Sequence, residues 1–98
     1  MNKQRIQQII QDSFDSLHNS AMIPDKIVIG DDTVIIGRDS VLDSISFITL
    51  FSELEDRLSE ETGKEIFLVL GEIHEFNQDK NVLTVSVLSN YIMNLLDN

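Results

Sequence analysis

The stretch LDSISFITLFSELEDRL, residues 42–58, decides the fold of this chain. Asp43 and Ser44 stand directly before apolar residues that recur every three or four positions. That spacing predicts an amphipathic helix, and short polar residues in front of it are typical of a helix start. We predict this helix over about Ser44 to Ser59. Its inward stripe would comprise Ile45, Ile48, Phe51 (or Phe47), Leu54 and Leu58.

Helical periodicity also appears on both sides of this stretch. It predicts a first helix over Asn2 to about His18, a short third helix over Gly71 to Phe76, and a last helix over about Thr84 to Leu96. The inward residues of the first helix would be Ile6, Ile10, Phe14 and Leu17, and those of the last Val85, Leu88, Ile92 and Leu95. The predicted fold class is therefore all-α, a four-helix bundle with a long first loop and a short third helix.

Two segments between the predicted helices are rich in β-branched or apolar residues. Residues 27–29 and 33–36 are separated by Gly30-Asp31-Asp32, which is compatible with a short hairpin or with an extended, partly buried loop. The apolar run 66–70 is too short to classify by its period, and a strand or a buried extended segment both fit it.

Composition limits the classes of function. The chain has 98 residues, enough for a single domain over residues 1–98. Its net charge is −10, from 17 acidic and 7 basic residues, which argues against nucleic-acid binding and favours partners with basic surfaces. There is no cysteine, no apolar core of a signal peptide, and no stretch long enough to span a membrane. The expected compartment is the cytoplasm.

Ser44 is the residue that could carry chemistry. A hydroxyl at a helix start lies outside the ladder of backbone hydrogen bonds, and the positive end of the helix dipole suits an attached phosphate. Asp43 could hold a metal ion or orient the hydroxyl, and Ile45 could anchor the helix start or meet a partner. The same residues also fit ordinary helix capping, which the tripeptide alone favours.

The wider pattern resembles the acyl carrier protein family over nearly the whole chain, from Asn2 to Leu96. The matching features are the order of the helices, Leu42-Asp43-Ser44, the pair Leu54-Glu55 three turns later, and Leu58 one turn beyond. Thr84-Val85 and Tyr91-Ile92 are similar to the family's last helix, and the extended form of residues 37–44 looks like a branch of specialised bacterial carriers. Ile45 departs from the leucine that is usual in the family.

The resemblance implies a carrier that catalyses nothing itself. Ser44 would receive a 4′-phosphopantetheine arm from coenzyme A through a magnesium-dependent holo-carrier-protein synthase (a phosphopantetheinyl transferase), with Asp43 and Ile45 beside the attachment point. The arm would carry acyl groups as thioesters in fatty acid, lipid or specialised metabolite biosynthesis. The partner-binding residues would be Glu53, Glu55 and Asp56, facing basic surfaces of the transferase, acyl-loading ligases and acyl-processing enzymes. A monomer is the family default.

Several alternatives stay open. Asp39-Ser40-Val41 is a second Asp-Ser-apolar triplet, but Ser40 would lie a full turn too far from Leu54-Glu55. An aminoacyl, D-alanyl or peptidyl carrier would share the fold and the attachment site. An unmodified acidic helical module that binds a basic protein is the alternative from another class. Enzymatic activity of the chain alone would need a base to activate the serine, and none is visible; no metal site is predicted either.

Overall fold

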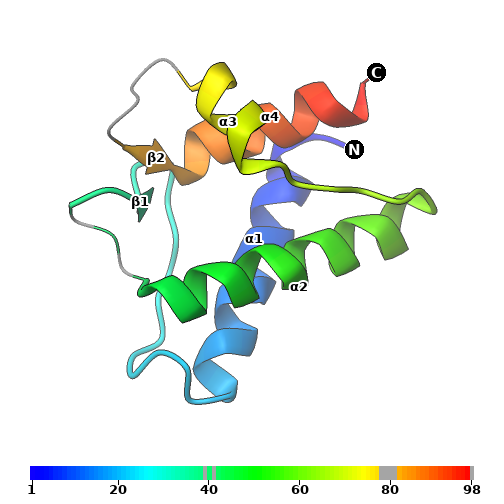
Figure 1. The fold of residues 1–98 in the computed structure, drawn as a ribbon. Coiled ribbons are helices and arrows are strands. Elements are labelled where there is room, and N and C mark those ends of the chain that lie inside the picture. The colour runs from blue at the N-terminus through cyan, green and yellow to red at the C-terminus, as the bar shows by residue number, and fades with distance from the viewer. Residues whose placement is uncertain (39, 41, 78–81, 98) are drawn as a thin grey trace.

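The computed structural model describes residues 1–38, 40, 42–77 and 82–97. It contains α1 (Lys3–Asn19), β1 (Val34–Ile36), α2 (Ser44–Thr62), α3 (Leu70–Phe76), β2 (Leu83–Thr84) and α4 (Val85–Leu96). Helix α1 packs against both α2 and α4, and α3 packs on α4 (Figure 1). The helical order follows the prediction, but the two strands pair, so the fold is mostly helical and not all-α.

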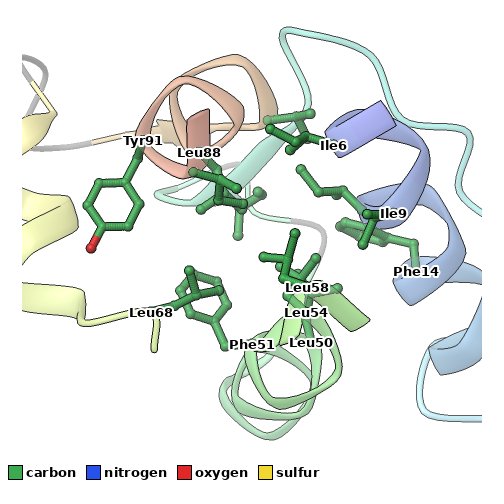
Figure 2. Packing of buried hydrophobic residues seen from close by; sticks show 14 of the residues in the cluster. Ile6, Ile9, Phe14, Leu50, Phe51, Leu54, Leu58, Leu68, Leu88 and Tyr91 are labelled. Carbon is green, nitrogen blue, oxygen red and sulfur yellow. The ribbon is translucent and has the colours of Figure 1, made fainter. Parts of the chain in front are cut away.

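The first helix confirms its predicted inward face. Asn2 caps it, since the Asn2 side-chain oxygen accepts a hydrogen bond of 2.8 Å from the backbone N–H of Arg5. Ile6, Ile10 and Phe14 are fully buried. Together with inward residues of α2 and α4, including Leu54, Leu58 and Leu88, they form one apolar core (Figure 2).

The predicted inward stripe of α2 is partly wrong. Leu54 and Leu58 are fully buried, but Ile45 and Ile48 are 69% and 64% exposed. A row of residues three apart advances only 300° per step, so it drifts around the helix and leaves the buried face within a few steps. The stripe that enters the core begins instead at Leu50 and Phe51 and leaves two isoleucines near the helix start facing outward.

The hairpin considered for residues 27–36 does not form. Residues 27–29 are held by Gln11 of α1, whose side-chain amide donates to the Ile27 carbonyl (2.7 Å) and accepts from the Ile29 N–H (2.9 Å). β1 pairs in antiparallel fashion with β2 from the far end of the chain, Val34 opposite Thr84. β1 therefore pairs with a strand that is distant in sequence and not with the nearby residues 27–29. The local sequence could not indicate this choice of partner.

The same contact region fixes the start of α4. Thr84, predicted as the first helical residue, is the cap, and its side-chain oxygen accepts from the N–H of Val87. The next two N–H groups donate to loop carbonyls, Val85 to Thr33 (2.9 Å) and Ser86 to Asp31 (3.0 Å). Residues 31–33 thus satisfy backbone donors that every helix leaves unpaired at its first turn.

The apolar run after α2 is an extended segment, here called the strap (residues 64–69). Gly63, in the left-handed conformation with φ of 70°, ends α2 and starts the return of the chain towards α3 (Figure 1). Side chains of α2 hold the strap: Ser59 Oγ accepts from the N–H of Ile66 (3.0 Å), and Glu55 Oε2 accepts from the N–H of Leu68 (2.8 Å). The strap is consequently positioned without a neighbouring strand.

Candidate attachment site at the start of α2

Ser44 is the first residue of α2, and its side chain is exposed. Asp43 before it is the cap, since Asp43 Oδ1 accepts a hydrogen bond of 2.8 Å from the N–H of Ser46. Within the described part of the chain, the Ser44 hydroxyl makes no hydrogen bond. The capping role therefore falls on the aspartate, and the serine oxygen is left accessible to an outside reagent.

Asp43 carries a negative charge next to this hydroxyl. Hydrogen bonds from Ser46, first from its backbone N–H, lower the pKa of the Asp43 carboxyl, and the N–H of Ile45 adds to the shift. Ionisation is thus favoured by the same contact that caps the helix. The carboxylate is exposed, so a metal ion held by another protein could reach it.

An open groove of about 520 Å³ lies beside Ser44. Its wall joins four parts of the fold: Ile36 of β1, Leu42 of the preceding loop, Ile48 of α2 and Leu70 of α3. Ile36, Ile48 and Leu70 are each more than one third exposed, so the rim is apolar. The exposed Ser44 hydroxyl therefore lies beside apolar side chains.

Ser40, the competing serine, is engaged in the loop. Its hydroxyl donates to the carbonyl of Ile35 (2.6 Å) and accepts from the N–H of Leu42 (3.2 Å). These bonds fix the path of the chain into Asp43 and Ser44. Ser40 is half-buried, and the other members of its triplet, Asp39 and Val41, lie outside the described residues.

Ser46 is a positioning residue that sequence reasoning did not single out. It is buried, and its hydroxyl donates to the carbonyl of Met22 (3.3 Å) in the loop after α1. A serine on the third position of a helix gave no signal of this role, because its partner is distant in sequence. Ile36 and Leu70, which complete the groove, were missed for the same reason.

The three acids predicted to bind partners do not share one free face. Glu53 pairs with Arg57 (3.3 Å), and the Glu55 carboxylate accepts from the strap. Only Asp56 is exposed and, within the described residues, without an ion pair. At 100° per residue, Glu55 lies on the Ser44 side of the helix and Glu53 roughly opposite. The structure brings Ser44 together with Asp43 and an apolar groove, and not with an acidic stripe.

A phosphate attached at Ser44 would lie at the start of α2 and beside the groove. The positive end of the dipole of a helix of 19 residues favours a negative group there, while the N–H groups of Ile45 and Ser46 already interact with the Asp43 carboxylate. The groove offers apolar side chains to whatever lies beyond that phosphate. Among the described residues, no group of three or more His, Cys, Asp or Glu side chains could hold a metal ion.

No helix in the described ranges is both long and apolar enough to cross a membrane. Comparisons of the chain with family models, with curated proteins and with solved structures found no match.

Proposed function

We propose that this protein is an acyl carrier protein and that Ser44 carries a 4′-phosphopantetheine arm. The observation that supports this most is the contrast between two serines. Ser44 presents an unengaged hydroxyl at a helix start beside an apolar groove, whereas the Ser40 hydroxyl is bonded to the backbone on both sides. The order of four helices with a long first connection supports the same family.

The residues around the site would each contribute in a different way. Ser44 supplies the oxygen of the new phosphodiester bond, the pyrophosphate bond of coenzyme A breaks, and adenosine 3′,5′-bisphosphate leaves. The serine proton passes to a base of the transferase, because no described side chain accepts it. The positive end of the α2 dipole favours the attached phosphate, while the N–H groups of Ile45 and Ser46 bind the Asp43 carboxylate. Asp43 keeps the helix start in place and offers its charge to the magnesium ion of the transferase. The arm itself supplies the thiol that holds the cargo as a thioester.

Partner enzymes would contact a surface that has both apolar and acidic residues. Ile48 lies about 40° and Ile45 about 100° around the helix from Ser44, both in the same direction, and both are mostly exposed. Of the three predicted acids, Asp56 is the best placed for a basic partner, since Glu53 and Glu55 already have partners within the protein. Charges of this kind speed encounter and set orientation, and buried apolar contacts supply more of the affinity.

Intact-mass spectrometry tests the proposal. The protein is incubated with coenzyme A, magnesium and a broad-specificity phosphopantetheinyl transferase, in parallel with Ser44→Ala, Ser40→Ala and Ser52→Ala. Ser52 is an exposed serine further along α2 and serves as the matched control. We expect one phosphopantetheine on the wild type and on Ser52→Ala, slower addition on Ser40→Ala because its loop is loosened, and none on Ser44→Ala.

Other outcomes have distinct meanings. Loss of modification only in Ser40→Ala would move the attachment site to the other serine. No addition to the wild type by several transferases would favour the unmodified interaction module. If Ser44 is modified, incubation of the modified protein with ATP and ligases for fatty acids or for amino acids separates an acyl carrier from an aminoacyl, D-alanyl or peptidyl carrier, since each cargo adds its own mass.

A further inference from the structure

The strap has one edge that is held and one that is open. In an extended chain, the N–H and C=O groups of successive residues point to opposite sides. The N–H groups of Ile66 and Leu68 point to α2, where Ser59 and Glu55 accept their hydrogen bonds. The N–H of Phe67 makes no hydrogen bond within the described part of the chain. The two α2 side chains thus act as the neighbouring strand on one edge only.

The side chains of the strap alternate in the same way. Ile66 and Leu68 are buried, and Leu68 points into the core beside Phe51 (Figure 2). Phe67 and Val69 point outward and are 62% and 46% exposed. An exposed phenylalanine and valine on an unpaired extended segment are unusual on a protein surface, where such edges are normally covered or charged.

A hollow of about 310 Å³ adjoins these outward residues. It lies between the strap, Glu72 of α3 and Leu95 of α4, and Phe67 and Val69 form part of its wall. The charged residues at its rim are Lys64, Glu65 and Glu72, which are exposed and have a net negative charge. The open edge is limited to Glu65 and Phe67, because the Val69 N–H faces the Tyr91 hydroxyl of α4 and the Val69 carbonyl accepts from the N–H of Ile73 as α3 begins.

We propose that the outer edge of the strap is a docking site for an extended, basic segment of a partner protein. Such a segment would add a short strand beside Glu65 and Phe67, place one apolar side chain in the hollow, and direct its Lys or Arg side chains to Glu65 and Glu72. Charge selects this occupant, because a second copy of this chain would also carry a net charge of −10 and be repelled. This surface does not depend on the modification of Ser44.

The probe for this site is a synthetic peptide that alternates lysine or arginine with valine or phenylalanine. Its binding to ¹⁵N-labelled full-length protein is followed by NMR. We expect shift changes at residues 64–69, at Glu72 and at Leu95, together with slower hydrogen exchange of the Phe67 amide. Phe67→Ser should weaken binding about tenfold or more. Val28→Ser, which removes an 83% exposed apolar residue elsewhere and leaves the net charge unchanged, is the control.

Four results would overturn this proposal. The first is an absence of binding, and the second is equal binding of a peptide in which glutamate replaces the basic residues. The third is shift changes confined to α2, with Phe67→Ser and Val28→Ser behaving alike. The fourth is another occupant. Binding to neutral lipid vesicles that depends on Phe67 would assign the surface to a lipid, and self-association in sedimentation that depends on Phe67 would assign it to a second copy.

Discussion

The two long connections that flank α2 are both held by side chains of a helix, but the side chains differ in their hydrogen-bonding groups. Residues 27–29 before α2 and the strap after it both run extended beside a helix without a neighbouring strand. In the first connection, the neutral amide of Gln11 offers a donor and an acceptor together, as a strand would. In the strap, the Ser59 hydroxyl and the Glu55 carboxylate both accept hydrogen bonds from N–H groups, and within the described residues neither donates to a strap carbonyl.

This difference has a functional side. The connection before α2 is also tied to β2 and α4, and it brings Ser40, Asp43 and Ser44 to a defined place. The strap is tied mainly to α2 and keeps an outer edge open. A connection held from several directions suits a fixed attachment point, whereas one held from a single side suits a surface that accepts another chain.

The largest expected effect is the loss of stability when one buried residue of each connection is replaced by alanine. Ile35 is 1% exposed and Leu68 is 8% exposed. Ile35→Ala should lower the free energy of unfolding by about 3–5 kcal/mol and Leu68→Ala by about 2–3 kcal/mol, because a strap held from one side can shift to fill the space. Urea unfolding measures both values. Equal losses, or a larger loss for Leu68→Ala, would contradict the comparison; Ile36→Ala and Phe67→Ala are the outward-facing controls.

The next effect concerns Gln11. Gln11→Met keeps the size of the side chain but removes both hydrogen bonds to residues 27–29, so we expect a loss of about 1–3 kcal/mol in unfolding free energy. The amide of Ile29 should exchange faster with solvent, while the Leu68 amide keeps its rate. Gln8→Met, on an exposed position of the same helix, should change little. Unchanged exchange at Ile29 would show that Gln11 does not hold this segment.

Glu55 should have a smaller effect confined to the strap. Glu55→Ala removes the acceptor for the Leu68 N–H, and we expect a loss of about 1 kcal/mol and faster hydrogen exchange at Leu68. Glu55→Gln keeps an acceptor oxygen and should retain most of the protection. If the two variants behave alike, the charge and not the hydrogen bond determines the role of Glu55. Exchange at Ile29 serves as the internal control.

The smallest effect is the pH dependence at Asp43. The folded state lowers the pKa of this carboxyl, so its contribution to stability is present above the pKa of the unfolded chain and is lost as the pH falls through the folded pKa. Asp43→Asn retains a capping oxygen and should remove this part of the acid dependence with little change at pH 7. A carboxyl ¹³C titration of the wild type measures the shift; an ordinary aspartate value would refute it.

Sequence predicted the extents of α1, α2 and α4 well because each presents a long amphipathic period, as the fully buried Ile6, Ile10 and Phe14 of α1 illustrate. The sequence did not predict which strands pair, because that pairing depends on residues that are distant along the chain. The run 33–36 could not reveal that it would pair with Leu83–Thr84.

Part of the candidate site could likewise be predicted from the sequence, and part could not. Asp43 and Ser44 were identifiable from their place before an apolar run, whereas the surrounding groove was not. Ile36 and Leu70 reach the groove from other parts of the chain. The three-residue spacing of Ile45, Ile48 and Phe51 predicted that Ile48 faces the core, but Ile48 is exposed. Glu55 was visible as an acid, but its hydrogen bond to the strap depends on how the chain returns after Gly63.

The pairing of β1 with β2 also affects when the site can be completed during synthesis. Val34 and Thr84 are about 50 residues apart, and contacts across such distances form late because a long loop must close first. Until residues 83–86 have left the ribosome and docked, β1 lacks its partner and the wall of the groove that contains Ile36 is incomplete. A transferase that contacts this wall would therefore act only on chains in which residues 83–86 have emerged and docked on β1.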